Sequence, residues 1–184
     1  MILSWFTKLG SPDLPPNGPT LPTVKFDASR VTDAVKADLW ESIQEFDDLP
    51  VGEGEAIYQA ALCSISKGRA LNILSDALTG IEVPKARAAE IAILLNNRAT
   101  AMMDADRQLA LGITEGIWLY SGAPCCSGRL QNDADRRRDD AHKAANGKRY
   151  LLAQGLLIEG RLTYPGREQG CKCSSKPIIR GFDD

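Results

Sequence analysis

The stretch PKARAAEIAILLNNRATAMMDADRQLALG, residues 84–112, predicts a long helix in this 184-residue chain. Its proline stands where a first helical turn tolerates one, and its closing glycine is a common helix terminator. Between them the apolar side chains recur at helical spacing, at Ala88, Ile91, Ala92, Leu95, Ala99, Met102 and Leu109. One face of this helix should therefore be buried against other elements.

Two further helices with apolar stripes are expected before it. The first has candidate caps at Asp27 and Ser29, stops at Leu49-Pro50, and repeats the apolar residues Val31, Val35, Leu39, Ile43 and Phe46. The second should run from about residue 55 to 78, with Gly80 ending it and one apolar side formed by Ile57, Ala61, Ile65, Leu71, Leu74 and Leu78. Amphipathic helices bury their stripes against one another, so residues 27–112 are predicted to form a helical region.

The pattern changes after Gly112. Residues 113–120 are β-branched and aromatic and predict a strand, whereas residues 133–145 predict a short helix. Glu159-Gly160 separates two apolar runs and is typical of a hairpin turn, and residues 174–179 predict a last extended segment. The predicted fold class is α+β: an N-terminal helical hairpin or bundle, followed by a small β-rich Cys/His module over residues 113–184.

Residues 1–26 are predicted to be an arm. Trp5, Phe6 and Leu9 give it an apolar end, and residues 11–23 hold five of the ten prolines of the chain. Proline fixes φ and favours extended backbone, so this segment suits a semi-rigid tether carrying an apolar anchor. A tail without regular structure fits the same composition.

The formal net charge of −2 is unevenly distributed, with −6 over residues 1–60 and +4 over residues 61–184. No run approaches the roughly 20 apolar residues that cross a bilayer, and the apolar start is too short for a signal peptide. We therefore expect a protein made and used in a cytosol, where cysteines stay reduced. The densest basic stretch is Arg129, Arg136, Arg137, Arg138, Lys143, Lys148 and Arg149. Because aspartates alternate with these residues, they suit either a self-paired helix face or contacts with DNA phosphates.

The only histidine and four of the five cysteines lie in the predicted β-rich module. Cys125 (or Cys126), His142, Cys171 and Cys173 form a Cys₃His set, which is a normal composition for structural zinc. A small module with a thin core would be stabilised by such a site. Reduced, partly buried thiols beside a surface histidine, with no metal, fit the same residues. A nucleophilic Cys–His pair would need a cleft and an oxyanion hole, and the sequence has no nucleophile motif.

From Ala89 onward the chain carries an ordered series of motifs. They are Glu90–Ala92 through Asn97–Ala101, Leu111–Trp118 with Ser121, Arg138, His142, Asn146-Gly147-Lys148, Pro165-Gly166, Gly170–Cys173, Pro177 and Phe182. In this order and spacing the series resembles the Mu F-like phage head-morphogenesis family of minor head or minor capsid proteins. Lys172 stands where that family usually has arginine, and the Cys125-Cys126 doublet is not a general family feature.

The resemblance implies a phage structural protein rather than an enzyme. Such a protein would be present in few copies in the virion head, and in the host cytoplasm during assembly. It would act in procapsid assembly, bound to the portal or the major capsid protein, as an oligomer and without a membrane. Arg138, Asn146-Gly147 and Pro165-Gly166 would then hold the module together with His142, Cys171 and Cys173.

Two other functions fit the same residues. A small metal-dependent hydrolase or nuclease would use the Cys/His site, but it would need an open coordination position and a general base. A packaging accessory would bind phage DNA through the basic stretch, and its binding would weaken steeply with salt.

Overall fold

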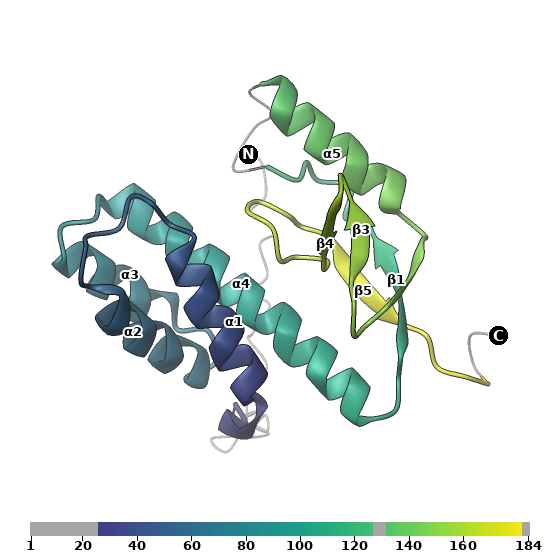
Figure 1. Cartoon of the computed structure of the whole chain (residues 1–184), viewed down its shortest axis with the longest axis horizontal. Coiled ribbons are helices and arrows are strands. Elements are labelled where there is room, and N and C mark those ends of the chain that lie inside the picture. Colours follow the sequence, from purple (N-terminus) through teal and green to yellow (C-terminus); the bar gives the residue numbers. More distant parts are fainter. Residues whose placement is uncertain (1–25, 127–131, 182–184) are drawn as a thin grey trace, which may run out of the picture.

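The computed structural model describes residues 26–126 and 132–181, and its fold is α+β as predicted (Figure 1). The helices are η1 (Ala28–Arg30), α1 (Asp33–Gln44), α2 (Gly54–Ser66), α3 (Leu71–Gly80), α4 (Lys85–Ala110) and α5 (Asp133–Ala145). The strands are β1 (Glu115–Leu119), β2 (Arg149–Leu151), β3 (Leu156–Ile158), β4 (Arg161–Thr163) and β5 (Ser174–Pro177). Helices α1–α4 form a bundle, and α5 with the strands forms a C-terminal module beside it.

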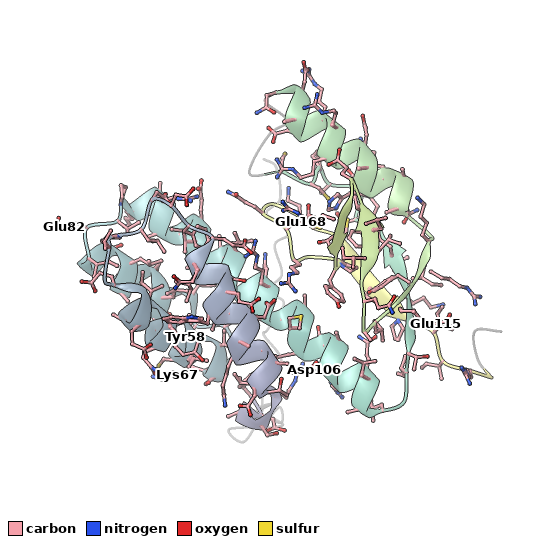
Figure 2. The ribbon with its side chains drawn as sticks, in the orientation of Figure 1. Tyr58, Lys67, Glu82, Asp106, Glu115 and Glu168 are labelled. Carbon is pink, nitrogen blue, oxygen red and sulfur yellow. The ribbon has the colours of Figure 1, made fainter. Side chains whose placement is uncertain are left out.

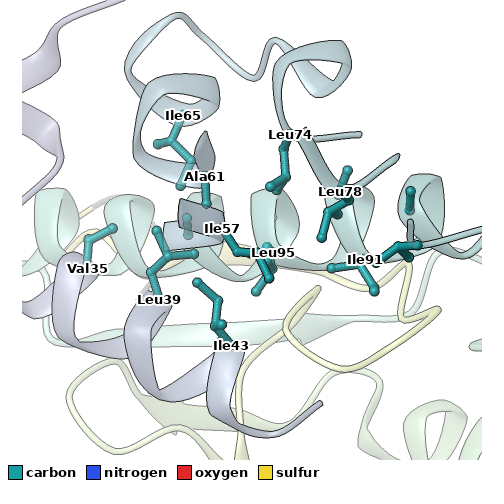
Figure 3. Close-up of a cluster of buried hydrophobic side chains, with 14 of the residues drawn as sticks. Val35, Leu39, Ile43, Ile57, Ala61, Ile65, Leu74, Leu78, Ile91 and Leu95 are labelled. Atoms are coloured by element: carbon teal, nitrogen blue, oxygen red, sulfur yellow. The ribbon is translucent and has the colours of Figure 1, made fainter. Parts of the chain in front are cut away.

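Helix α4 is the central element of the bundle, because α1, α2 and α3 all pack on it. Figure 3 shows side chains of the four helices meeting in one apolar core, with Leu39, Ile57, Leu74, Leu78 and Leu95 almost completely buried. Each such side chain contributes about 1.5–3 kcal/mol through burial. The apolar spacing of residues 84–112 therefore corresponds to one helix whose inner face is buried as far as Met103, whereas the predicted core residues Met102 and Leu109 are only partly buried.

The predicted helix over residues 55–78 is wrong, because the chain makes two helices there. Helix α2 ends at Ser66, and Gly68 and Arg69 both take positive φ, at 75° and 69°. The Ser64 hydroxyl donates a hydrogen bond of 2.9 Å to the carbonyl of Ala70 and closes the turn. The turn places α3 back on the same core, so the apolar repeat continues across the break. Lys67-Gly68, a basic residue before a glycine, was the available stop signal.

The start of α1 also differs from the prediction. Asp27 caps the short helix η1, and Thr32 caps α1 by accepting the Val35 N–H at 3.3 Å. The Thr32 hydroxyl also donates to Asp106 of α4 at 2.6 Å. The cap therefore anchors the first turn of α1 on the central helix.

The C-terminal module combines a three-stranded antiparallel sheet, in the order β2-β1-β5, with the β3–β4 hairpin. Strand β2 was not predicted, because its three residues are not joined to another strand by a hairpin turn like the Glu159-Gly160 turn that revealed the equally short β3 and β4. Trp118 of β1 is fully buried and packs with Ala145 of α5, Ile158 of the hairpin and the module cysteines. Predictions that fall on residues 1–25, Arg129 and Phe182 lie outside the described residues.

Candidate metal centre

Four side chains from separate parts of the module meet in its interior. Cys125 follows β1, His142 lies on α5, and Cys171 and Cys173 precede β5. Their ligand atoms, three Sγ and a histidine ring nitrogen, all lie within 4.8 Å of one another, and all four residues are buried. The prediction of a surface histidine is therefore wrong, because His142 is completely buried.

Three of the six separations between the ligand atoms are close to those of a tetrahedral metal site. Cys125 Sγ and Cys173 Sγ are 3.5 Å apart, and His142 Nδ1 lies 3.4 Å from Cys171 Sγ and 3.6 Å from Cys173 Sγ. Tetrahedral zinc bonds of about 2.3 Å to sulfur and about 2.0 Å to nitrogen require separations of about 3.8 Å between two sulfurs and about 3.5 Å between sulfur and nitrogen. The four residues could therefore bind a metal ion with little rearrangement.

Polar groups around the cluster orient its ligands. Nε2 of His142 lies 3.3 Å from Oε2 of Glu168, so Nδ1 faces the thiols. The Gly166 N–H donates a hydrogen bond of 3.3 Å to Cys171 Sγ. A carboxylate behind a histidine ligand and a backbone N–H on a thiolate are the partners that metal sites use. Glu168 was not predicted, although it lies only three residues before Cys171.

Asp139 fixes the position of Cys125. One carboxylate oxygen of Asp139 accepts the Cys125 N–H at 2.9 Å and the Tyr120 hydroxyl at 2.8 Å. The other oxygen lies 2.7 Å from Nζ of Lys143. Asp139 is fully buried, so the predicted solvated helix face does not include it. It shares the inward side of α5 with His142, three residues later, and this spacing was the available signal.

Three groups of the cluster, Cys125, His142 and Cys173, have shifted pKa values. Hydrogen bonds from Cys171 and Cys173 hold the pKa of Cys125 far below its usual range, whereas the neighbouring Cys125 sulfur raises the pKa of Cys173. Burial lowers the pKa of His142, but hydrogen bonds with Cys125, Cys171 and Glu168 outweigh it and raise this pKa to about 11. These shifts arise from the close contacts among the thiols and the histidine ring. Metal uptake would displace the remaining protons.

The other motif residues surround this cluster. Asn146 ends α5 and its Oδ1 accepts the Tyr120 N–H at 2.9 Å, while the Gly147 N–H donates to the Trp118 carbonyl at 2.8 Å. Arg138 donates to the Gln169 carbonyl at 3.3 Å. Pro165 is buried, and the turn at Gly166 has a φ of 81°. The structure thus brings Arg138, Asn146-Gly147 and Pro165-Gly166 into the module that holds the cluster, whereas the first motifs of the series, Glu90–Ala92 and Asn97–Ala101, lie on α4 in the bundle. Cys126 is buried beside Cys125 but does not belong to the four-residue cluster.

The loop that carries Glu168 also connects the module to the helical bundle (Figure 2). The Arg167 guanidinium pairs with Asp38 of α1, and its backbone carbonyl accepts a hydrogen bond of 3.2 Å from Arg98 of α4. Arg98 in turn pairs with Glu45 at 2.8 Å. Arg167 and Glu168, consecutive residues of one loop, therefore contact the bundle and the histidine of the cluster.

Gly116 should not tolerate a side chain, because a hydrogen bond crosses over it. The Tyr150 hydroxyl donates to Ser175 Oγ at 2.6 Å, and a Cβ at Gly116 would lie 2.8 Å from that oxygen and 3.2 Å from the Tyr150 ring. Gly116→Ala should lower the free energy of unfolding of the module by about 1–3 kcal/mol. Urea unfolding followed by circular dichroism measures this change. The matched control is Gly80→Ala, where nothing lies within 4 Å, and an equal loss there would contradict the explanation.

Comparisons of the chain with protein-family models, with curated proteins and with solved structures give no match. Within residues 26–126 and 132–181, no helix combines the length and the apolar character that crossing a membrane requires. All five cysteines lie in these segments, and none of them forms a disulfide.

Proposed function

We propose that Cys125, His142, Cys171 and Cys173 hold one structural zinc ion. The observation that carries this proposal is the meeting of four buried ligand atoms within 4.8 Å of one another. Zinc would cross-link the segment after β1, helix α5 and the segment before β5. Four protein ligands complete a tetrahedron, which is typical of a structural site, whereas catalytic zinc sites usually have three protein ligands and a water molecule.

The metal content of protein purified under reducing conditions tests this proposal. Elemental mass spectrometry should find about one zinc per chain, and a chelator should remove it together with the structure of the module. Thiol titration of the native protein should leave the three cluster cysteines protected until the metal is removed. Metal-free protein with freely reacting thiols would rule out the zinc site.

The function that we propose for the whole chain is that of a minor head protein in phage head morphogenesis, bound to the portal or to the inner capsid. The support is that residues from the later part of the motif series, distant in sequence, lie in the single module that holds the cluster. They are Arg138, His142, Asn146, Gly147, Pro165, Gly166, Cys171 and Cys173. A closed metal site suits a stable assembly module better than a catalytic centre, which needs an open coordination position.

Co-expression tests the assembly function. The chain should sediment with procapsids when it is produced together with the portal and major capsid proteins of the phage genome that encodes it. Cys171→Ser should be depleted from the particles, whereas Cys63→Ser should be retained, because Cys63 lies on α2 outside the cluster. If the wild-type chain stays in the supernatant while procapsids form, this function is wrong.

A further inference from the structure

One face of the three-stranded sheet is exposed and partly apolar. Along β1 the side chains alternate, so Gly116 and Trp118 face the module core and their neighbours face outward. The residues that face outward, called here the outer sheet face, are Glu115, Ile117, Leu119, Arg149, Leu151, Ser174 and Lys176.

The outer sheet face combines an apolar centre with flanking cations. Ile117 stands in register with Arg149 on one side and Lys176 on the other. Leu119 and Leu151 are 37% and 45% exposed, which is high for large aliphatic side chains on a regular sheet. An exposed apolar strip with a polar rim is typical of a surface that binds another protein. The charged residues of this face are two cations, Arg149 and Lys176, and one carboxylate, Glu115, so its net positive charge favours a partner that is both apolar and acidic.

In the bundle, the connection between α1 and α2 presents a surface that is both apolar and acidic. Pro50, Val51 and Gly52 form a turn that is closed by a hydrogen bond of 3.3 Å from the Glu53 N–H to the Pro50 carbonyl. Gly52 takes a φ of 92°, and Val51 is fully exposed at the tip. Around Val51, the segment of residues 47–55, called here the acidic loop, carries Asp47, Asp48, Glu53 and Glu55 and no basic residue. Asp48 already pairs with Arg87 of α4, so the negative charge that the loop offers comes mainly from Asp47, Glu53 and Glu55.

We infer that the outer sheet face of one copy of this protein binds the acidic loop of a second copy. Val51 would contact Ile117 and Leu119, and the acidic side chains would face Arg149 and Lys176. The charges of the two halves agree with this pairing, at −6 over residues 1–60 and +4 over residues 61–184. The proposed contact between two copies involves neither the metal site nor a phage partner.

The two surfaces cannot meet within one chain. The connection between α1 and α2 lies at the far end of the bundle from β1 and β5, and Glu115 lies on the side of the module away from the bundle (Figures 1 and 2). The contact is therefore head-to-tail, and each copy keeps one unused surface for the next copy. Pairing of two outer sheet faces is less favourable, because it would bring Arg149 and Lys176 of one copy against the same cations of the other.

Two variants test this contact, one on each surface. Val51→Ser removes the apolar tip of the acidic loop, and Arg149→Glu reverses a cation of the outer sheet face. Wild-type protein should self-associate as its concentration rises, and added salt should weaken the association. Each variant should associate at least about tenfold more weakly. Sedimentation equilibrium of the full chain measures these masses, and circular dichroism checks that each variant is folded.

The decisive sample is a mixture of the two variants in equal amounts. Val51→Ser keeps an intact outer sheet face and Arg149→Glu keeps an intact acidic loop, so the mixture should form a dimer that does not grow further. Leu157→Ser and Arg137→Glu are matched controls at exposed positions away from both surfaces, and they should associate like the wild type. A wild type that is monomeric at every concentration, or a mixture no heavier than its components, would overturn the inference.

Discussion

Replacement of Cys173 by serine is expected to unfold the C-terminal module while helices α1–α4 stay folded. Cys173 is buried between Cys125 Sγ at 3.5 Å and His142 Nδ1 at 3.6 Å. A hydroxyl there supplies no thiolate, so the zinc ion that we propose would be lost. The buried core of this module centres on Trp118 and contains few large aliphatic side chains. We expect a loss of about 4 kcal/mol or more, as for the removal of a structural metal.

Thermal unfolding followed by circular dichroism measures this loss, and Cys63→Ser is the control. Cys63 is only partly buried, and it lies on α2 outside the cluster, so its replacement should have a small effect. Cys171→Ser should behave like Cys173→Ser. A chelator should reproduce the effect in the wild type and add nothing to either variant. Equal shifts in melting temperature for all three serine variants would refute the special role of the cluster.

Replacement of Arg167 by alanine is expected to cost about 3 kcal/mol, because it leaves the buried Asp38 carboxylate without its partner. Only 8% of Asp38 is exposed, and Arg167 pairs with it from the loop of the module. Burial raises the pKa of Asp38, although Arg167 and Arg98 act against this. The charged form of this aspartate is therefore costly in the interior even when it is paired.

A double-mutant cycle with Asp38→Asn separates this pair from other effects of the variants. The double variant should be more stable than the sum of the two single changes predicts, because the unpaired charge is then absent. Zinc content should not change, since Arg167 is not a ligand. Arg87→Ala is the control, because Arg87 and Asp48 form an exposed pair and its loss should cost at most about 1 kcal/mol. Similar losses for Arg167→Ala and Arg87→Ala would show that the contact between the module and the bundle contributes little.

Local patterns were sufficient to predict most elements. The apolar spacing of residues 84–112 predicted α4, and Glu159-Gly160 between two apolar runs predicted the β3–β4 hairpin. Both depend on side chains a few residues apart, so both can be read along the chain. The apolar repeat over residues 55–78 gave a wrong prediction of one helix, because the repeat continues through the turn at Gly68 and Arg69. A repeat shows which side chains are buried but not whether the backbone between them is unbroken.

The candidate site could be predicted by residue type but not by geometry. Cysteine and histidine are the ligands that zinc prefers, so Cys125, His142, Cys171 and Cys173 could be selected from their chemistry. Nothing in the sequence distinguished Cys125 from Cys126, or indicated that His142 was buried. The sequence also did not reveal that Glu168 contacts His142 or that Asp139 holds Cys125, because a carboxylate in a charged stretch usually faces solvent.

The amino-acid sequence thus determined the helices, the hairpin and the set of residues able to bind a metal, since these depend on neighbouring side chains and on their chemistry. Only the tertiary structure decided which of these residues meet. Cys125 and Cys173 are 48 residues apart, and His142 and Cys171 are 29 apart. Their contact depends on how α5 packs against Trp118 of β1 and on the pairing of β1 with β5. Long-range packing of this kind leaves no periodic signal in the chain.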